Sequence, residues 1–261
     1  MIYMSPERKF VDLDLIGEKE FLTKVQIDNS LEMGWKPEDI MLVMNFPYEY
    51  NGVKAIVLDA YCEYSPTASK IYAICKMFEL GMIKDEIYWF HDMDAFQLEP
   101  LDLELDRNKV AISKYGIIGS ADSHYNRRWS TGTIFFRDGT EDVFKWIKES
   151  CEKYKGNEEV CLLVMTRHND NDLLNRIDVL NITYNFATRR RKIFEQYNTI
   201  TDLPIKVIHF HPFDKRQVYY EGRGLDNMDV CVYGKNPLGK PLVSERLIRL
   251  FKKHEITSNG A

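Results

Sequence analysis

Apolar and polar positions alternate in two different ways along the chain. Compact apolar runs rich in β-branched and aromatic residues predict strands at residues 2–4, 40–45, 53–58, 86–90, 109–113, 133–136 and 206–211. Apolar positions three and four apart predict helices at residues 19–33, 65–81, 141–154, 158–166 and 244–254. Strands that alternate with helices in this way are typical of an α/β fold. We therefore expect a Rossmann-like mixed sheet flanked by helices.

Length and composition fit one folded domain. The chain has 261 residues, of which 44% are hydrophobic, which is enough for a large core and excludes a disordered chain. No internal repeat and no clear linker interrupts the sequence, so residues 1–261 are expected to form a single domain. Within it, residues 212–261 are expected to form a basic C-terminal loop and helix, because residues 212–241 contain several Gly and Pro with little periodicity.

Charge is distributed unevenly. The net charge of −5 argues against a dedicated nucleic-acid-binding protein. Residues 186–261, however, contain 14 lysines and arginines against 8 aspartates and glutamates. This cationic third can face the phosphate groups of a ligand, a polyanion or, as a peripheral contact, an anionic membrane. A solvated surface is the simpler alternative.

Several features bear on the cellular compartment. No apolar run approaches the roughly 18 residues that a transmembrane helix needs, and the first residues are charged where a signal peptide would be apolar. The five cysteines form no C-x-x-C pair, so reduced thiols are expected rather than a disulfide scaffold or a structural zinc site. These features together predict a cytoplasmic protein. The oligomeric state has no signal in the sequence.

Asp92 and Asp94 are the sharpest chemical feature of the sequence. They directly follow the apolar run at residues 86–90, and in an extended segment residues i and i+2 point to the same side. Both carboxylates can therefore converge on one cation, and oxygen ligands of this kind suit Mg²⁺ or Mn²⁺. The alternative is a pair of solvated aspartates in a turn.

Two histidines in the last predicted strand, at residues 206–211, strengthen the expectation of a metal site. His209 and His211 alternate with apolar residues and should share one face of a strand, and a neutral imidazole is a good ligand for Mn²⁺. Lys215 follows closely, where a cationic side chain can neutralise a phosphate. The alternative is that one or both histidines are hydrogen-bonded core residues.

The order of five short motifs resembles the nucleotide-sugar-dependent glycosyltransferases of the GT-A fold, in particular the galactosyltransferase and glycogenin-like group, glycosyltransferase family 8. That group has a D-x-D after an apolar strand, then N-[ST]-G-x-hydrophobic, D-Q-D-x-L-N, Y-N and I-H-F followed by a lysine. The corresponding segments here are WFHDMD at 89–94, STGTIFF at 130–136, NDNDLLN at 169–175, YN at 184–185 and IHFH at 208–211 with Lys215.

The resemblance implies a role for each matching residue. Asp92 and Asp94 would hold the divalent metal and contact the ribose and diphosphate, and His209 would be the third protein ligand, with His211 as the alternative. Lys215 would bind the departing diphosphate, and Tyr3 is a candidate for stacking on the base. Asp170 and Asp172 would lie beside the donor sugar and the acceptor as catalytic residues.

Other acidic residues have plainer interpretations. Asp170 and Asp172 can also belong to a polar turn in which Asp172 caps the next helix. Glu158 and Glu159 are interpreted as solvent-exposed charges.

The leading hypothesis is a metal-dependent glycosyltransferase. It would transfer a hexose from a nucleotide-diphosphate sugar, most simply a UDP-sugar, to a carbohydrate or other hydroxyl acceptor, with Mn²⁺ or Mg²⁺ as cofactor and, by the glycogenin-like resemblance, with retention of configuration. One alternative uses the same residues for phosphoryl or nucleotidyl transfer or as a nuclease. Another is a noncatalytic nucleotide- or carbohydrate-binding domain of the same fold, because Ser130 and Asn171 replace the group's usual Asn and Gln.

Overall fold

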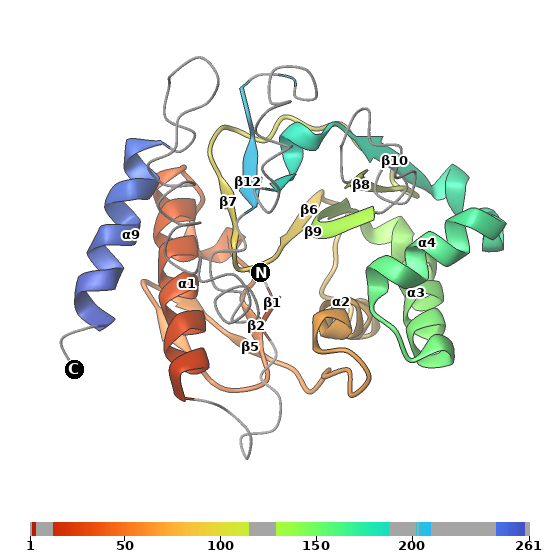
Figure 1. Cartoon of the computed structure of the whole chain (residues 1–261), viewed down its shortest axis with the longest axis horizontal. Coiled ribbons are helices and arrows are strands. Elements are labelled where there is room, and N and C mark those ends of the chain that lie inside the picture. Colours follow the sequence, from red (N-terminus) through yellow and green to blue (C-terminus); the bar gives the residue numbers. More distant parts are fainter. Residues whose placement is uncertain are drawn as a thin grey trace, which may run out of the picture.

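The computed structural model describes residues 2–3, 13–114, 129–187, 202, 204–209 and 244–258. These residues form a mixed α/β structure in which helices flank short sheets (Figure 1). The expected fold class is therefore confirmed. Residues 210–243, which include His211 and Lys215, lie outside the described residues.

The N-terminal sheet is parallel. Its strands are β1 (Ile2–Tyr3), β2 (Val43–Met44) and β5 (Ile56–Val57), in the order β1-β2-β5. The helix α1 (Leu13–Glu32) connects the first two strands, and the hairpin of β3 (Glu49–Tyr50) and β4 (Val53–Lys54) precedes the third. The apolar run predicted as one strand at residues 53–58 is thus divided between a hairpin and the parallel sheet.

The central sheet carries most of the core. Its four strands are β6 (Tyr88–His91), β8 (Val110–Lys114), β9 (Trp129–Phe136) and β10 (Ile177–Leu180), in the order β10-β8-β9-β6. Every residue of β9 is buried, because this strand has a neighbour on each side and a covered surface on each face. Ile134 and Phe136 belong to the main core cluster, whereas Phe135 between them belongs to a second cluster. This alternation follows from the pleat of a strand.

Three helices cover one face of the central sheet. They are α2 (Ser69–Glu79), α3 (Glu141–Tyr154) and α4 (Glu158–His168), and they pack against one another beside the sheet (Figure 1). Apolar residues of all three helices share the main core cluster with β6, β8 and β9. Among the described residues, 3-10 turns lie at Pro37–Asp39, Pro66–Ala68, Asp138–Thr140, Asp170–Arg176 and Ile182–Tyr184.

A third small sheet joins distant parts of the chain. It contains β7 (Ala95–Gln97), β11 (Phe186–Ala187) and β12 (Val207–His209), in the order β11-β12-β7. The C-terminal helix α9 (Glu245–Ser258) packs against α1 beside this sheet (Figure 1). None of the described helices is long and apolar enough to cross a membrane.

Candidate metal centre

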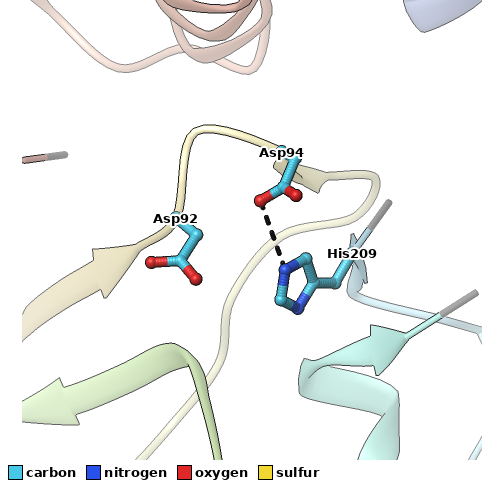
Figure 2. Close-up of side chains that lie close together, drawn as sticks. All are labelled: Asp92, Asp94 and His209. Carbon is cyan, nitrogen blue, oxygen red and sulfur yellow. Dashed lines mark ion pairs between the residues drawn. The ribbon is translucent and has the colours of Figure 1, made fainter. Parts of the chain in front are cut away.

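Two carboxylates and one imidazole converge at the edge of the central sheet. Asp92 and Asp94 lie in the turn between β6 and β7, and His209 ends β12. One ligand atom from each residue lies within 4.8 Å of the others, and Nε2 of His209 is 3.2 Å from Oδ1 of Asp94. Figure 2 shows the two carboxylates and the imidazole facing a common space. The structure therefore brings together the three residues that the sequence singled out as metal ligands.

Backbone pairing places the three side chains. The Asp92 amide donates to the Gly132 carbonyl at 2.8 Å, and the Ala95 amide donates to the Asp92 carbonyl at 3.1 Å, which closes the turn. Strand β7 then pairs antiparallel with β12, with Ala95 opposite His209. His209 consequently lies one residue along the register from Asp94, although the two are far apart in the sequence.

Gly132 makes room for the imidazole. A Cβ at this position would lie 2.1 Å from Cε1 and 2.4 Å from Nδ1 of His209, which is far inside van der Waals contact. The glycine of the S-T-G segment is therefore required by the close approach of the histidine ring to strand β9.

Asn185 orients the imidazole. Its Nδ2 donates to Oγ of Ser130 at 2.9 Å and to the Ser130 carbonyl at 3.2 Å, and its Oδ1 lies 3.0 Å from Nδ1 of His209. Because the amide nitrogen is occupied as a donor, the amide oxygen accepts the Nδ1 proton, which leaves Nε2 directed to the carboxylates. Such an outer hydrogen bond is what fixes the ring of a metal-binding histidine.

The electrostatic field of the centre attracts positive charge. Burial alone would lower the pKa of His209, but Asp94 and Asp92 outweigh it and raise the pKa above its usual value of 6.5. A proton or a metal cation satisfies the same field, so the two compete for Nε2. The donor set of two carboxylates and one imidazole fits Mn²⁺ or Mg²⁺.

A buried lysine lies on the other side of Asp92. Lys70, in the first turn of α2, is 7% exposed, and its Nζ lies 2.7 Å from Oδ1 of Asp92 and 3.2 Å from Oε1 of Glu158. Burial opposes the charge of the ammonium, but Asp92 and Glu158 raise its pKa above the usual 10.5. Lys70 is therefore a fixed positive charge beside the candidate metal site.

Glu158 and Glu159 complete this network. Oε1 of Glu158 accepts from Oγ1 of Thr131 at 2.8 Å, and Oε1 of Glu159 accepts from the Thr131 amide at 3.1 Å. Glu158 is only 2% exposed, so the expectation that it is a solvent charge is wrong. Lys70 and Glu158 compensate each other, which permits both charges to be buried. The sequence contains one signal for this arrangement: Asn157, the N-cap of α4, is followed directly by two acidic residues in the first turn of the helix.

The structure places Asp170 and Asp172 in an exposed turn at the other end of α4. Asp172 accepts hydrogen bonds from Asn175 and Asn169, which lower the pKa of its carboxyl group. Residues 169, 171 and 172 have positive φ, a conformation that Asn and Asp tolerate. The eleven residues of α4 separate this turn from Glu158 by about 16 Å along the helix. The contacts are those of a polar turn, but Asp172 does not cap a following helix, because it lies inside the 3-10 turn Asp170–Arg176. A catalytic role for the two aspartates stays a prediction.

For three other predicted site residues, the structure describes no side-chain contacts. The backbone of Tyr3 belongs to β1, but its side chain is outside the described part of the structure, as are His211 and Lys215. Their roles in binding a base, a metal or a diphosphate also stay predictions.

Comparisons with known proteins give similarity at the level of structure. No protein-family model matches the sequence. No curated protein matches it either. Among solved structures, the galactosyltransferase LgtC in complex with donor and acceptor sugar analogues has 16% identity and a TM-score of 0.49, over 87% of this chain and 94% of that one.

Two further glycosyltransferase structures are also similar. Mouse xyloside xylosyltransferase 1 has 12% identity and a TM-score of 0.46, over 80% of this chain and 95% of that one. The glycosyltransferase GlyE of Streptococcus pneumoniae has 12% identity and a TM-score of 0.48, over 84% of this chain, which spans 59% of the GlyE chain. The structure is thus similar to those of several glycosyltransferases.

Proposed function

We propose that the protein is a metal-dependent glycosyltransferase that transfers a hexose from a nucleotide-diphosphate sugar, a UDP-hexose, to an acceptor hydroxyl. The observation that carries this proposal is the convergence of Asp92, Asp94 and His209 around one position, with the Lys70 ammonium beside Asp92. This arrangement places acidic metal ligands and a permanent cation at one edge of an α/β sheet, where open sheets bind nucleotides.

The chemistry of sugar transfer explains the arrangement. Cleavage of the sugar–phosphate bond develops negative charge on the diphosphate and positive charge on the anomeric carbon. A bound divalent cation would supply compensation for the diphosphate charge. Within the chain, Asp92, Asp94 and His209 would hold that cation, and Lys70 adds a positive charge that needs no proton transfer to be present.

The carboxylates near Thr131 are the proposed counterpart on the sugar side. Glu159 is half-buried beside Thr131, one residue from Gly132, whereas Glu158 holds Lys70 in place. We assign to Glu159 the stabilisation of positive charge on the donor sugar and to Glu158 the positioning of Lys70. Asp170 and Asp172 remain the alternative carboxylates for the sugar side. Retention of anomeric configuration is the expected outcome, and the configuration of the product tests it directly.

The first test is binding of UDP with and without Mn²⁺ by calorimetry. We expect Mn²⁺ to strengthen UDP binding in the wild-type protein and to have little effect in Asp94→Asn, which removes a charged ligand but keeps the side-chain shape. The matched control is Asp170→Asn, in an exposed turn, which should behave like the wild type. Equal and negligible UDP binding with and without Mn²⁺ in the wild type would contradict the proposal.

The second test identifies the reaction. A panel of UDP- and GDP-sugars is incubated with Mn²⁺, and release of the nucleoside diphosphate is measured. Release from a UDP-hexose supports glycosyl transfer. Release of inorganic phosphate or a nucleoside monophosphate, without release of sugar, would favour phosphoryl or nucleotidyl transfer instead.

A further inference from the structure

A cavity lies apart from the three candidate metal ligands. It measures about 260 Å³ and is lined by the end of α1 and the following turn, by residues just before β2, and by three residues of β6, namely Tyr88, Trp89 and His91, with Glu86 and Ile87 before them. Its inner wall includes His91, the residue before Asp92, but none of the three candidate ligands. Its volume lies just below the roughly 300–1,000 Å³ typical of pockets for drug-sized ligands, which suits a ligand of one or two small rings.

Aromatic side chains form fixed walls of this cavity. The Trp35 indole is 37% exposed and donates from Nε1 to Oε1 of the buried Gln97 at 2.7 Å. The Trp89 ring lies against the His91 ring in a tilted arrangement, with 4.2 Å between the ring centroids. Because both indoles are held by protein contacts before any ligand arrives, binding against them loses little conformational entropy.

The polar groups around the cavity select the kind of ligand. Three exposed carboxylates line it, those of Glu38, Asp39 and Glu86, and no lysine or arginine occurs among its described lining residues. Phosphate and other anions are therefore repelled, and the cavity is not suited to the nucleotide diphosphate. Carboxylates instead accept hydrogen bonds from hydroxyl groups.

The aromatic walls distinguish a hydroxylated ring from a simple cation. A sugar offers an apolar ring face that packs against an indole and hydroxyl groups that donate to carboxylates. A small ammonium ion offers donors but no apolar face. Aromatic rings and carboxylates together match the apolar faces and the hydroxyl edges of a sugar.

We propose that this cavity binds a neutral saccharide, with a sugar ring against Trp35 and Trp89 and hydroxyl groups hydrogen-bonded to Glu38, Asp39 and Glu86. The site is separate from the metal centre and does not depend on the transfer reaction. Saccharide bound here would lie next to β6, the strand that Asp92 follows, so the cavity can hold part of a carbohydrate close to the protein without occupying the donor position.

The experiment measures saccharide binding without Mn²⁺ or nucleotide. Glucose, galactose, lactose and maltotriose are titrated against the full chain, and binding is followed by tryptophan fluorescence and saturation-transfer NMR. We expect saturable binding of at least one of these sugars. Trp35→Ala should weaken it about tenfold, the scale of one lost aromatic contact, and Glu86→Gln by a smaller factor.

Controls make each result decisive. Glu152→Gln changes an exposed acid on α3, and Asp94→Asn changes the metal centre; both should bind the sugar like the wild type. Because Glu86 is exposed, Glu86→Gln reports on the cavity even if Trp35→Ala does not fold. The proposal is overturned if no sugar binds saturably or if the two cavity variants bind as well as the wild type. Loss of sugar binding in Asp94→Asn alone would also overturn it, by moving the binding to the metal centre.

Discussion

The two ends of helix α4 each carry a pair of acidic residues in opposite environments. Glu158 and Glu159, at the N-terminal end, contact Lys70 and Thr131 beside the metal centre. Asp170 and Asp172, past the C-terminal end, lie in an exposed turn where Asp172 contacts the amides of Asn169 and Asn175. The carboxylate chemistry is the same at both ends. What differs is whether another part of the chain supplies a charged or hydrogen-bonding partner.

The largest expected effect comes from breaking the buried pair at the N-terminal end. Glu158→Ala leaves Lys70 with one carboxylate partner fewer in a buried position, and we expect the free energy of unfolding to fall by about 3 kcal/mol. Urea denaturation followed by circular dichroism measures this change. Asp172→Ala, at the other end, should lower the free energy of unfolding by less than about 1 kcal/mol. Equal losses in the two variants would remove the distinction between the two ends.

The next largest effect is expected at Gly132, the residue of β9 that contacts the His209 ring. Gly132→Ala forces the His209 ring away from its position, because the added Cβ would overlap the imidazole. We expect Mn²⁺ binding to fall below detection by calorimetry and the free energy of unfolding to fall by about 1–3 kcal/mol.

Gly156→Ala is the matched control for this substitution. A Cβ added at Gly156 would meet atoms no nearer than 3.9 Å. Gly156 lies just before α4, the helix that carries Glu158 and Glu159. Wild-type Mn²⁺ affinity in Gly132→Ala would show that His209 does not bind the metal.

A smaller effect is expected when His209 is kept but loses the hydrogen bond that orients its ring. Asn185→Ala removes the acceptor for Nδ1 of His209, and loss of such an outer contact typically lowers metal affinity by about 10- to 100-fold. Mn²⁺ titration followed by electron paramagnetic resonance gives the affinity. Asn185→Asp restores an acceptor for Nδ1 and should recover part of the loss, which a purely structural defect would not predict.

The smallest effect is expected at the exposed turn, and it decides between the two carboxylate pairs. Asp172→Asn should leave the turnover of the nucleotide sugar within about twofold of the wild type, whereas Glu159→Gln should lower kcat by roughly 10²-fold or more, the scale of a lost electrostatic contact at a reacting centre. The assay is release of the nucleoside diphosphate at saturating donor. A large loss of kcat in Asp172→Asn, with Glu159→Gln active, would return the catalytic role to the turn.

The sequence by itself determined the elements that depend on local pattern. Periods of two and of 3.6 residues are properties of neighbouring positions, so the strand before Asp92 and the helices α3 and α4 could be located from apolar spacing alone. The two aspartates were expected to point to one side as residues i and i+2 of an extended segment. Their carboxylates do converge, but from a turn that the Ala95 amide closes on the Asp92 carbonyl. The strands β3, β7, β10 and β11 were not predicted, because each has too few apolar residues in a row, or polar residues among them, to stand out as an apolar run.

Only the tertiary structure decided which distant residues meet. The register of β7 against β12 places His209 beside Asp94, and Lys70, in the first turn of α2, reaches both Glu158 in the first turn of α4 and Asp92. The acids at the two ends of α4 look alike in the sequence, since each pair lies close to an asparagine. Burial and a partner charge depend on the path of the whole chain, and these separate Glu158 from Asp172.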